Sequence, residues 1–298
     1  MKELYQSIQE LLFDLFQKEV KVMEEKRIMG GAINDAFLLR LDNGKEVFLK
    51  TNVKDMFDMF IKERTGIQAI YDTHTIQTPE IYGIGVDDER NCSFIMMEYL
   101  CASRNQDYYR VFGQELAKVH LADTKAYTGL KTYGFVEDNY IGSTPQRNEC
   151  YDSWIDFYRE CRMRPQFEMA KGYFQEEDLE ACEGLLKNLD KYLIEPKYPS
   201  LLHGDLWEGN STVGRDGKAW LIDPACYVGH YETDLAMMEL YGGFSPELFK
   251  AYYEIIPQET GYEVRRDIYQ LYHVINHLNL FGDRYLAQTR HLIYKYAK

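Results

Sequence analysis

The spacing of apolar residues divides this chain into a strand-rich first third and a mostly helical remainder. Over residues 2–18, leucine and isoleucine recur at intervals of three or four positions, which predicts an amphipathic helix. From about residue 20 to residue 100 the apolar runs are short and are bounded by turn residues, which predicts β-strands. Within that region residues 57–70 return to helical spacing, so we expect one helix among the strands.

Turn signals locate the strands of the first third. Asp42-Asn43-Gly44 precedes the apolar run 47–50, and this combination predicts a tight hairpin. Residues 81–86 and 94–97 have the pattern of two further strands, joined across the turn Asp87-Asp88-Glu89. The order of strands, one helix and more strands is that of the small lobe of a kinase.

Beyond Leu100 the apolar residues follow helical spacing for most of the remaining sequence. Ser245-Pro246 is a typical helix start, because Ser caps the first turn and Pro fits the first helical position. Apolar stripes at helical spacing occupy residues 112–119, 154–158, 179–193 and 264–296. We therefore predict an α+β, protein-kinase-like fold of two lobes, with a small antiparallel-sheet lobe in residues 1–99 and a mainly helical lobe in residues 100–298.

The composition fits a globular enzyme and disfavours several classes of partner. Of the 298 residues, 45% are apolar and 28% are charged. The formal net charge of −14 argues against nucleic acid, because affinity for nucleic acid comes largely from neutralised phosphates. No stretch approaches the ~18 apolar residues that span a bilayer. The first residues lack the apolar run of a secretory signal, and the six cysteines are dispersed without metal-ligand spacing. We expect a cytoplasmic protein without nucleic-acid or membrane partners, either a monomer or a weak homodimer.

The segment His203-Gly204-Asp205-Leu206-Trp207-Glu208-Gly209-Asn210, followed by Asp223, carries the candidate chemistry. Phosphoryl transfer from ATP needs a carboxylate that accepts the proton of the attacking hydroxyl, and oxygen ligands that hold Mg²⁺ on the phosphates. We assign Asp205 as the general base and Asn210 and Asp223 as the Mg²⁺ ligands. A lone aspartate in a loop is usually a cap or turn residue, but this combination at this spacing favours catalysis. The predicted cofactors are ATP and Mg²⁺.

A basic and an acidic residue in the first third fit the phosphate side of such a site. Lys50 closes a predicted strand and is expected to reach the α- and β-phosphates. Glu63, in the predicted helix that follows, is its expected ion-pair partner. Asp58 in the same helix is the alternative carboxylate, although its shorter side chain has a poorer reach. Taken without the downstream motif, an exposed Lys and an exposed Glu would be the simpler interpretation.

Two backbone segments are candidates for the nucleotide itself. Gly30, Gly31 and Asn34 lie between the first two predicted strands, where a loop must cover the triphosphate, and glycines permit close backbone approach. A Gly-Gly pair alone is more often a plain turn, so position rather than composition supports this assignment. Glu98 and Leu100 follow an apolar strand at the expected junction of the lobes, where backbone groups would contact adenine.

These residues resemble the fructosamine/ketosamine kinases, relatives of the aminoglycoside and choline kinases. The similarity extends through Trp207 to Ile222-Asp223-Pro224-Ala225 and Gly242-Gly243-Phe244, and upstream to Thr144-Pro145-Gln146. His-Gly-Asp alone is shared by many small-molecule kinases, whereas Trp207 with the 144–146 and 242–244 segments is more specific. The matches run from the glycine loop to residue 244. Ala32 departs from this pattern in carrying neither a hydroxyl nor a thiol, so a cysteine-based switch in that loop is not expected.

The resemblance implies ATP-dependent phosphorylation of the 3-hydroxyl of ketosamines, either free or bound to protein lysines. It implies that Asp205 deprotonates that hydroxyl and that Trp207 packs against the sugar or its aglycone, although Trp207 could instead support the catalytic loop. His230 and Asn139 are weaker candidates for substrate contact, and His230 could equally cap a turn. Asp234 is expected to brace the catalytic loop, and His120 to be structural.

Two other interpretations of the chain remain. It could phosphorylate another small alcohol such as an aminoglycoside, choline or homoserine. Trp207 disfavours this, as do the family-like motifs between residues 133 and 166, which include Thr144-Pro145-Gln146. It could also be a non-catalytic nucleotide-binding scaffold. That would require the loss of a key group, yet the candidate catalytic, metal and phosphate residues are all present.

Overall fold

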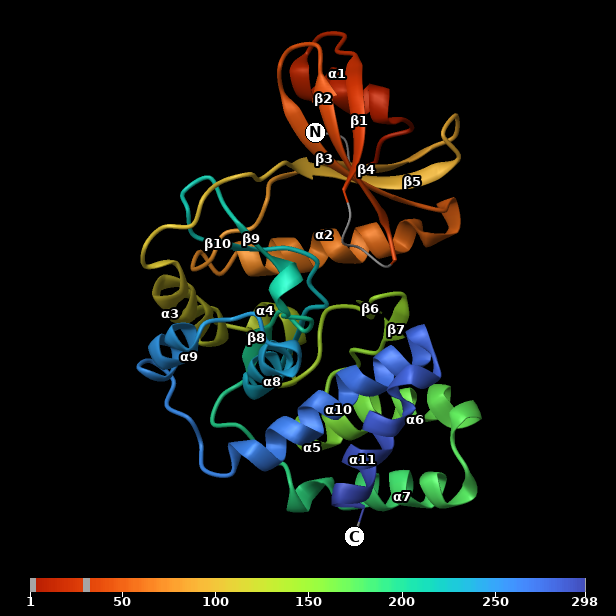
Figure 1. Cartoon of the computed structure of the whole chain (residues 1–298), viewed down its shortest axis with the longest axis vertical. Helices are drawn as coiled ribbons and strands as arrows, with labels where there is room; N and C mark the ends of the chain where they lie inside the picture. The colour runs from red at the N-terminus through yellow and green to blue at the C-terminus, as the bar shows by residue number, and fades with distance from the viewer. Residues whose placement is uncertain (1–3, 29–32, 298) are drawn as a thin grey trace.

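The computed structural model describes residues 4–28 and 33–297, which form a sheet lobe stacked on a larger helical lobe (Figure 1). The N-terminal end lies in the sheet lobe and the C-terminal end at the far tip of the helical lobe. This is the predicted α+β architecture. Among the described residues, no helix is both long and apolar enough to cross a membrane.

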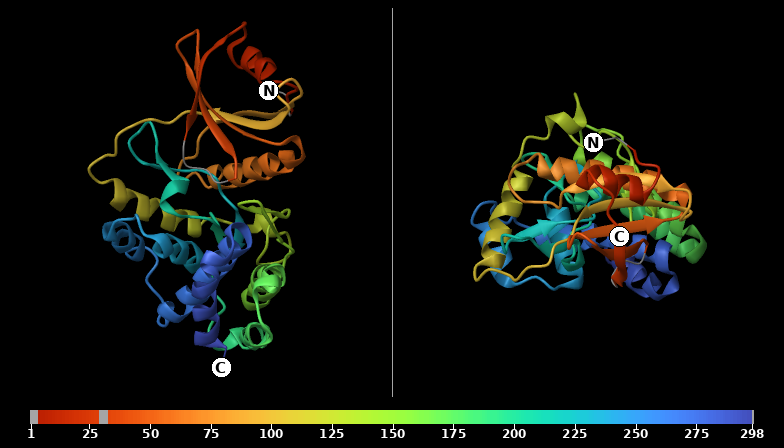
Figure 2. Two further views of the ribbon diagram at one scale, coloured as in Figure 1. Left: turned by 45° about the vertical axis from the view of Figure 1, so that its right-hand side comes forward. Right: turned by 90° about the horizontal axis from the view of Figure 1, so that it is seen from above.

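The sheet lobe is one five-stranded antiparallel sheet in the order β1-β2-β3-β5-β4. Its strands are β1 (Val22–Ile28), β2 (Asp35–Leu41), β3 (Glu46–Asn52), β4 (Ile81–Asp87) and β5 (Cys92–Glu98). The β2–β3 hairpin turns at Gly44, whose φ of +78° is a conformation that glycine adopts at little cost. The short 3₁₀ turn η1 (Lys54–Met56) leads into α2 (Phe57–Tyr71). This helix lies between the sheet and the helical lobe in Figure 1 and in the left view of Figure 2.

The first helix is shorter than the sequence pattern predicted. α1 covers Ile8–Phe16, with Ser7 as its N-cap, rather than residues 2–18. Tyr5 precedes it in extended conformation and forms an isolated parallel bridge with Gly85 of β4. The Tyr5 backbone is therefore bonded to the sheet edge and cannot join the helix.

The helical lobe contains most of the remaining helices and several two-stranded ribbons. Its helices are α3 (Tyr108–His120), α4 (Lys125–Thr128), α5 (Trp154–Phe157), α6 (Arg164–Ala170), α7 (Glu176–Lys187), α8 (Glu232–Tyr241), α9 (Pro246–Tyr253), α10 (Tyr262–Phe281) and α11 (Leu286–Tyr296), with the π-helix Tyr158–Met163 joining α5 to α6. Its strands are β6 (Asn139–Ile141), β7 (Thr144–Gln146), β8 (Ser200–Leu202), β9 (Ser211–Val213), β10 (Ala219–Leu221) and β11 (Tyr227–Gly229). The predicted capping role of Ser245 at the start of α9 is confirmed. A large apolar core centres on α10, which packs on α6, α8 and α11.

The last predicted helix is two helices. The apolar pattern runs through residues 264–296, but α10 ends at Phe281 because Gly282 takes a φ of +87°. α11 then returns along the lobe toward α7.

The two lobes meet through tightly packed backbone. Leu221 at the end of β10 donates its N–H to the Gln77 carbonyl of the sheet lobe, at 3.0 Å. Gly66 of α2 lies against Pro224, and a Cβ added at Gly66 would be only 3.0 Å from Pro224 Cγ. The Cys226 thiol donates to the Gly66 carbonyl. Helix α2 is therefore seated directly on the segment that carries Asp223.

Candidate active site

The catalytic segment leaves β8 through a turn that requires glycine. β8 is completely buried and pairs antiparallel with β11. At Gly204 the φ is +82°, and an added Cβ would lie 2.1 Å from the Ala225 carbonyl oxygen. Ala225 in turn donates its N–H to the His203 carbonyl. This close backbone approach holds the segment after Asp223 against the segment before Asp205.

His203 connects the catalytic loop to the metal-binding segment through its two ring nitrogens. Nε2 lies 2.9 Å from the Ile222 carbonyl, and Nδ1 accepts from the Asp205 N–H at 3.3 Å. Burial lowers the pKa of His203. The donor and acceptor pattern therefore assigns a neutral imidazole with its proton on Nε2. His203 fixes the position of both Asp205 and the residue before Asp223.

Asp234 braces the start of the catalytic loop, as predicted. Its carboxylate accepts from the N–H groups of His203 at 2.8 Å and Gly204 at 2.9 Å, and it faces His120 Nε2 at 3.2 Å. Burial opposes its ionisation, yet the hydrogen bond from His120 and the attraction of both histidines hold the pKa of Asp234 below its usual range. His120 is fully buried and its other ring nitrogen faces the Tyr252 hydroxyl, so its predicted structural role is confirmed.

Asp234→Asn is expected to weaken both the fold and turnover. The amide would turn a donor toward backbone N–H groups, and a lost hydrogen bond to a charged group costs roughly 1.5–3 kcal/mol. Urea unfolding and ADP release would measure the two effects. Tyr252→Phe, which removes only the outer contact on His120, is the matched control and should cost about 1 kcal/mol with turnover preserved. Wild-type stability and turnover in Asp234→Asn would contradict the bracing role.

Asp205 has the electrostatic character of a general base. The residue is half-buried. Burial, with a smaller contribution from the Asp234 charge, raises the pKa of Asp205 to about 7, although a hydrogen bond from Asn210 opposes the rise. Asn210 Nδ2 donates to both the backbone oxygen and Oδ2 of Asp205, at 2.8 and 3.1 Å. A base with a pKa near neutrality can both accept and release a proton at working pH.

Lys50, Glu63 and Asp223 form one charged cluster across the lobes. Lys50 is buried in the central strand β3, and its Nζ lies 2.9 Å from Glu63 Oε1 of α2. The same Nζ contacts Asp223 Oδ1. Asp58, the alternative partner, instead faces Lys62 at 3.6 Å and the Tyr140 hydroxyl at 3.1 Å. The geometry therefore favours Glu63.

The residues present fit a magnesium ion that is bound together with nucleotide. Asn210 uses its Nδ2 on Asp205, which leaves Oδ1 as an oxygen donor, and Asp223 offers a partly exposed carboxylate. Among the described residues, no group of three or more His, Cys, Asp or Glu side chains could hold a metal. Mg²⁺ commonly takes one or two protein ligands and completes its shell with phosphate oxygens and water.

A cleft of about 540 Å³ lies between the lobes, in the position expected for the nucleotide. Lys50, Glu98 and Leu100 line it, and the sheet pairing of β5 ends at Glu98, so the backbone beyond is available to a ligand. Asn34 lies at the start of β2, where its side chain accepts from Asn52 Nδ2 at 2.7 Å. Gly30 and Gly31 lie outside the described residues.

Apart from Met97, which the sequence offered equally as an adenine contact or a core residue, the apolar walls of this cleft were not predicted. They come from both lobes: Leu38, Phe48, Pro79, Met97 and Ile222. Apolar strand residues carry no signal that separates a ligand wall from the core. The sequence also gave the C-terminal helices no role, whereas Tyr241 at the end of α8 contacts His277 of α10. Burial, nearby Tyr285 and the charge of Asp205 together raise the pKa of Tyr241.

Trp207 is a partly exposed aromatic side chain on the catalytic loop. It is 37% exposed, two residues beyond Asp205, and its ring lies over Gly209 of the 3₁₀ turn η5 (Glu208–Asn210). A Cβ at Gly209 would fall 2.2 Å from that ring. Gly243 packs in the same way against the Glu208 side chain. Gly209 and Gly243 therefore leave room for two side chains of the catalytic loop, those of Trp207 and Glu208.

The structure places Asn139 and His230 away from the expected substrate contacts. Asn139 is buried, donates to the Cys226 carbonyl at 2.7 Å and accepts from Gln146 at 2.8 Å, so its amide anchors the β6–β7 hairpin. His230 is 1% exposed and follows Gly229, which pairs with Ser200 at the end of β8 remote from Asp205. Asn139 is therefore bonded within the β6–β7 region, and His230 lies away from the catalytic loop, so the structure does not bring either side chain to Asp205.

The β6–β7 hairpin also holds α2 against the helical lobe. Lys62, the neighbour of Glu63, lies 2.7 Å from Glu137 just before the hairpin. The Tyr140 hydroxyl on β6 donates to Asp58 of α2. Gln146 on β7 donates to the Ala225 carbonyl at 3.1 Å. These contacts link the helix that carries Glu63 to the segment that carries Asp223.

Lys62→Met is expected to lower kcat on the order of fivefold, which corresponds to the loss of a contact worth ~1 kcal/mol. Without the ion pair from Lys62 to Glu137, α2 holds the neighbouring Glu63 less firmly in place. Lys54→Met is the matched control, since its ion pair with Asp88 stays within the sheet lobe. Adding Glu137→Gln to Lys62→Met should cause little further loss, and fully additive losses would contradict the linkage.

Several known proteins are similar to this chain over most of its length. The fructosamine kinase family model matches residues 4–298. A chloroplastic protein-ribulosamine 3-kinase from Oryza sativa subsp. indica is 38% identical over 284 residues, covering 94% of this chain and 81% of that protein. A protein named probable ketoamine kinase from Vibrio parahaemolyticus is 35% identical over 299 residues, covering 98% and 99%.

Solved structures give the same family and fold. A crystal structure from Haemophilus somnus, provisionally named a fructosamine-3-kinase, has a TM-score of 0.84 at 30% identity and covers 98% of this chain and 97% of its own. An aminoglycoside phosphotransferase variant solved with AMP-PNP and hygromycin B has a TM-score of 0.66 at 15% identity, with 97% of each chain covered, and supports the fold alone. Because the family model matches residues 4–298, this chain belongs to the fructosamine kinase family.

Proposed function

We propose that the protein is an ATP-dependent ketosamine 3-kinase, which phosphorylates the 3-hydroxyl of sugar–amine adducts. The observation that carries this proposal is the catalytic loop, where a half-buried Asp205 and an exposed Trp207 stand beside the Lys50–Glu63–Asp223 cluster. The named activities of the family's members supply the acceptor class.

Each residue of the site has a distinct task in this proposal. Asp205 accepts the proton of the sugar hydroxyl as that oxygen attacks phosphorus. Lys50, held by Glu63, orients the α- and β-phosphates. Mg²⁺, when bound, neutralises charge on the phosphates, and Asn210 and Asp223 are the residues that would hold it. The backbone of Glu98 and Leu100 would contact adenine, with Gly30, Gly31 and Asn34 near the phosphates.

Trp207 is proposed to contact the sugar ring or its aglycone. An aromatic face packs well against the C–H surface of a sugar, and the exposed ring lies on the catalytic loop itself. The formal net charge of −14 is compatible with an acceptor that carries an amine.

ADP release with Mg·ATP across a panel of acceptors tests the function. The panel contains ribulosyl-lysine, fructosyl-lysine, an aminoglycoside, choline and homoserine, with Asp205→Asn as the inactive control. Turnover on the ketosamines, absent with the other alcohols, is the expected result. Turnover on another alcohol alone would keep the phosphotransferase chemistry and overturn the acceptor class.

The pH dependence of turnover should report the general base. Because Asp205 must be ionised to accept a proton, and its pKa is about 7, kcat/KM should rise with pH and level off above about 7. A pH–rate series with limiting ketosamine measures this rise. A kcat/KM that stays constant from about pH 5 to about pH 8, on both sides of the Asp205 pKa of about 7, would contradict this role.

A further inference from the structure

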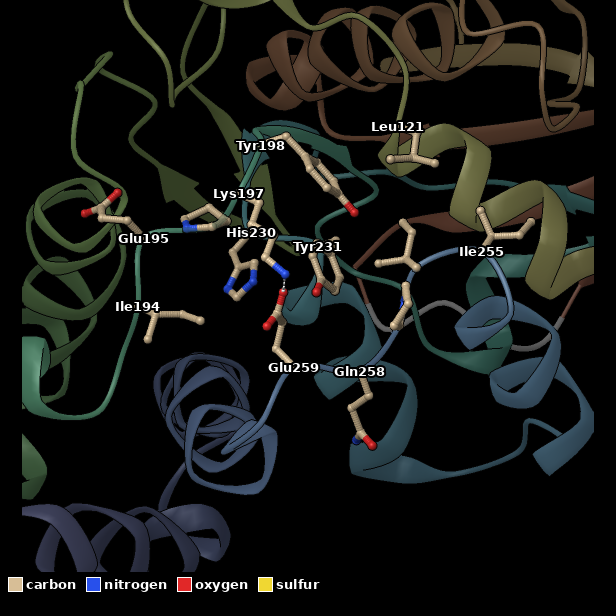
Figure 3. A pocket seen from close by; sticks show the side chains of 13 residues that line it. Leu121, Ile194, Glu195, Lys197, Tyr198, His230, Tyr231, Ile255, Gln258 and Glu259 are labelled. Carbon is tan, nitrogen blue, oxygen red and sulfur yellow. Dashed lines mark ion pairs between the residues drawn. The ribbon is translucent and has the colours of Figure 1, made fainter.

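A second cavity, of about 410 Å³, lies in the helical lobe around His230 and Tyr231 (Figure 3). It is enclosed by the end of α3, the segment 194–198, His230 with Tyr231, and the α9–α10 loop. It shares no lining residue with the nucleotide cleft. The β8–β11 pairing places it at the end of the ladder remote from Asp205. Its size is within the range of small-molecule sites.

His230 presents a hydrogen-bond donor to this cavity. Trp154 Nε1–H donates to the Tyr269 hydroxyl oxygen at 3.0 Å, so the Tyr269 proton is directed to His230 Nδ1, at 2.8 Å. Nδ1 is then the acceptor and Nε2 carries the ring proton. Burial and the nearby Arg265 charge keep the pKa of His230 well below its usual range, so the ring is neutral. Among the described residues, none accepts a hydrogen bond from Nε2.

The walls of the cavity suit a flat apolar body. Tyr198 and Tyr231 stack with ring centroids 5.9 Å apart and planes 21° from parallel. Pro196, Ile255, Ile256 and Pro257 complete the apolar lining. These groups match the general composition of ligand sites, in which apolar walls surround a few polar groups that fix orientation.

The charged groups at the cavity disfavour an anionic ligand. Lys197 is paired with Glu259 at 2.5 Å, and in the view of Figure 3 this ion pair lies between His230 and Tyr231. Glu195 accepts from the Trp154 and Ile155 N–H groups at the start of α5. The charge of Lys197 is therefore already neutralised. A carboxylate oxygen of Glu259 can still accept a hydrogen bond from a ligand N–H.

We propose that this cavity binds a small, flat, neutral molecule bearing an amide or lactam group, as aromatic amides and nucleobases do. The ligand carbonyl accepts from His230 Nε2–H, its N–H donates to Glu259, and its ring lies against the apolar walls. The site is separate from the proposed ketosamine and nucleotide sites. It adjoins the catalytic machinery, because the His230 carbonyl accepts from Thr233, the residue before Asp234.

Benzamide is the probe for the first test, and benzoate is its charged counterpart. In protein labelled with ¹⁵N-histidine, benzamide should shift the His230 Nε2–H resonance along a saturable curve in the millimolar range, with saturating Mg·ATP present or absent. Benzoate should bind about tenfold more weakly. The absence of a saturable shift with benzamide would overturn the site, and equal binding of benzoate would overturn the ligand class.

A cavity-filling variant localises the binding. Ile194→Trp introduces a large ring from a wall position that is 40% exposed, and should abolish both the shift and the rise in melting temperature that benzamide causes. Leu130→Trp, at a fully exposed position elsewhere, should preserve both. Unchanged benzamide binding in Ile194→Trp would overturn this location. Neither readout depends on turnover, so its outcome is independent of the proposed kinase activity.

Discussion

Asp205→Asn is expected to bind Mg·ATP like the wild type and to lose phosphorylation by ~10²–10⁴-fold, the usual contribution of a positioned acid–base group. The amide has the same shape and its oxygen can still accept from Asn210, so the loop geometry should persist. It cannot accept the substrate proton. Nucleotide titration and ADP release separate the two properties.

The same variant should gain stability at alkaline pH. Because the folded-state pKa of Asp205 is raised to about 7, the folded state holds its proton more tightly than the unfolded state. The wild type therefore loses stability as pH rises from the ordinary carboxyl range to about 7, and Asn does not. Asp205→Asn should have a higher melting temperature than the wild type at about pH 8. At about pH 4, close to the ordinary carboxyl pKa of about 3.9, the side chain at this position is neutral in both folded proteins, so the two melting temperatures should be close.

Asp152→Asn is the control for both measurements. Asp152 is a surface carboxylate paired with Lys131, remote in sequence from the catalytic loop and largely exposed. Its replacement should leave turnover and the pH dependence of melting unchanged. Retained turnover in Asp205→Asn would remove Asp205 as the base. A melting difference that does not vary with pH would contradict its raised pKa.

Asp223→Asn is expected to lose turnover on the order of 10²-fold or more and to lose most of the effect of Mg²⁺ on ATP affinity. A metal ion contributes several kcal/mol of charge stabilisation in such reactions, and Asp223 is the only carboxylate among the proposed ligands. ATP affinity with and without Mg²⁺ is the direct measurement. Lys50 keeps its contact with Glu63, so ATP affinity without the metal should change little.

Comparison with Asp223→Ala separates the metal effect from backbone strain. Asp223 has a φ of +55°, a conformation that Asn tolerates better than most residues. In Asp223→Ala the left-handed backbone should cost about 1–2 kcal/mol of stability. Asp223→Asn should retain more of the wild-type melting temperature, while both variants lose the metal effect. If Asp223→Asn keeps normal turnover, Asp223 does not hold the metal.

Local pattern was sufficient where the element depended on its own residues. The hairpin at Gly44, helix α2 and strands β4 and β5 were predicted because turn chemistry and apolar periodicity act over a few positions. The pattern failed where a distant partner intervened. Tyr5 pairs with Gly85 instead of extending α1. Gly282 ends α10 within a continuous apolar stripe, and a single glycine does not reveal such a break reliably.

The candidate site shows the same difference between features that depend on neighbouring residues and features that depend on distant ones. Spacing within one loop identified Asp205 and Asn210, and the structure brings these two together at 3.1 Å. For Asn139 and His230 the residue type suggested substrate contact. The structure instead bonds Asn139 to the Cys226 carbonyl and places Nδ1 of His230 against the Tyr269 hydroxyl, partners that lie far away in the sequence. The Lys62–Glu137 contact, 75 residues apart, has no local signal at all.

The sequence by itself determined the two-lobe α+β fold, the family and the identity of the residues assigned to catalysis, because these depend on residue types at fixed short spacings. Only the tertiary structure decided which carboxylate faces Lys50, how Asp234 braces the loop, and why the pKa of Asp205 is raised. Those properties arise from burial and from contacts between segments far apart in the chain. Hydrophobic periodicity records which face of an element is buried, but not which partner buries it.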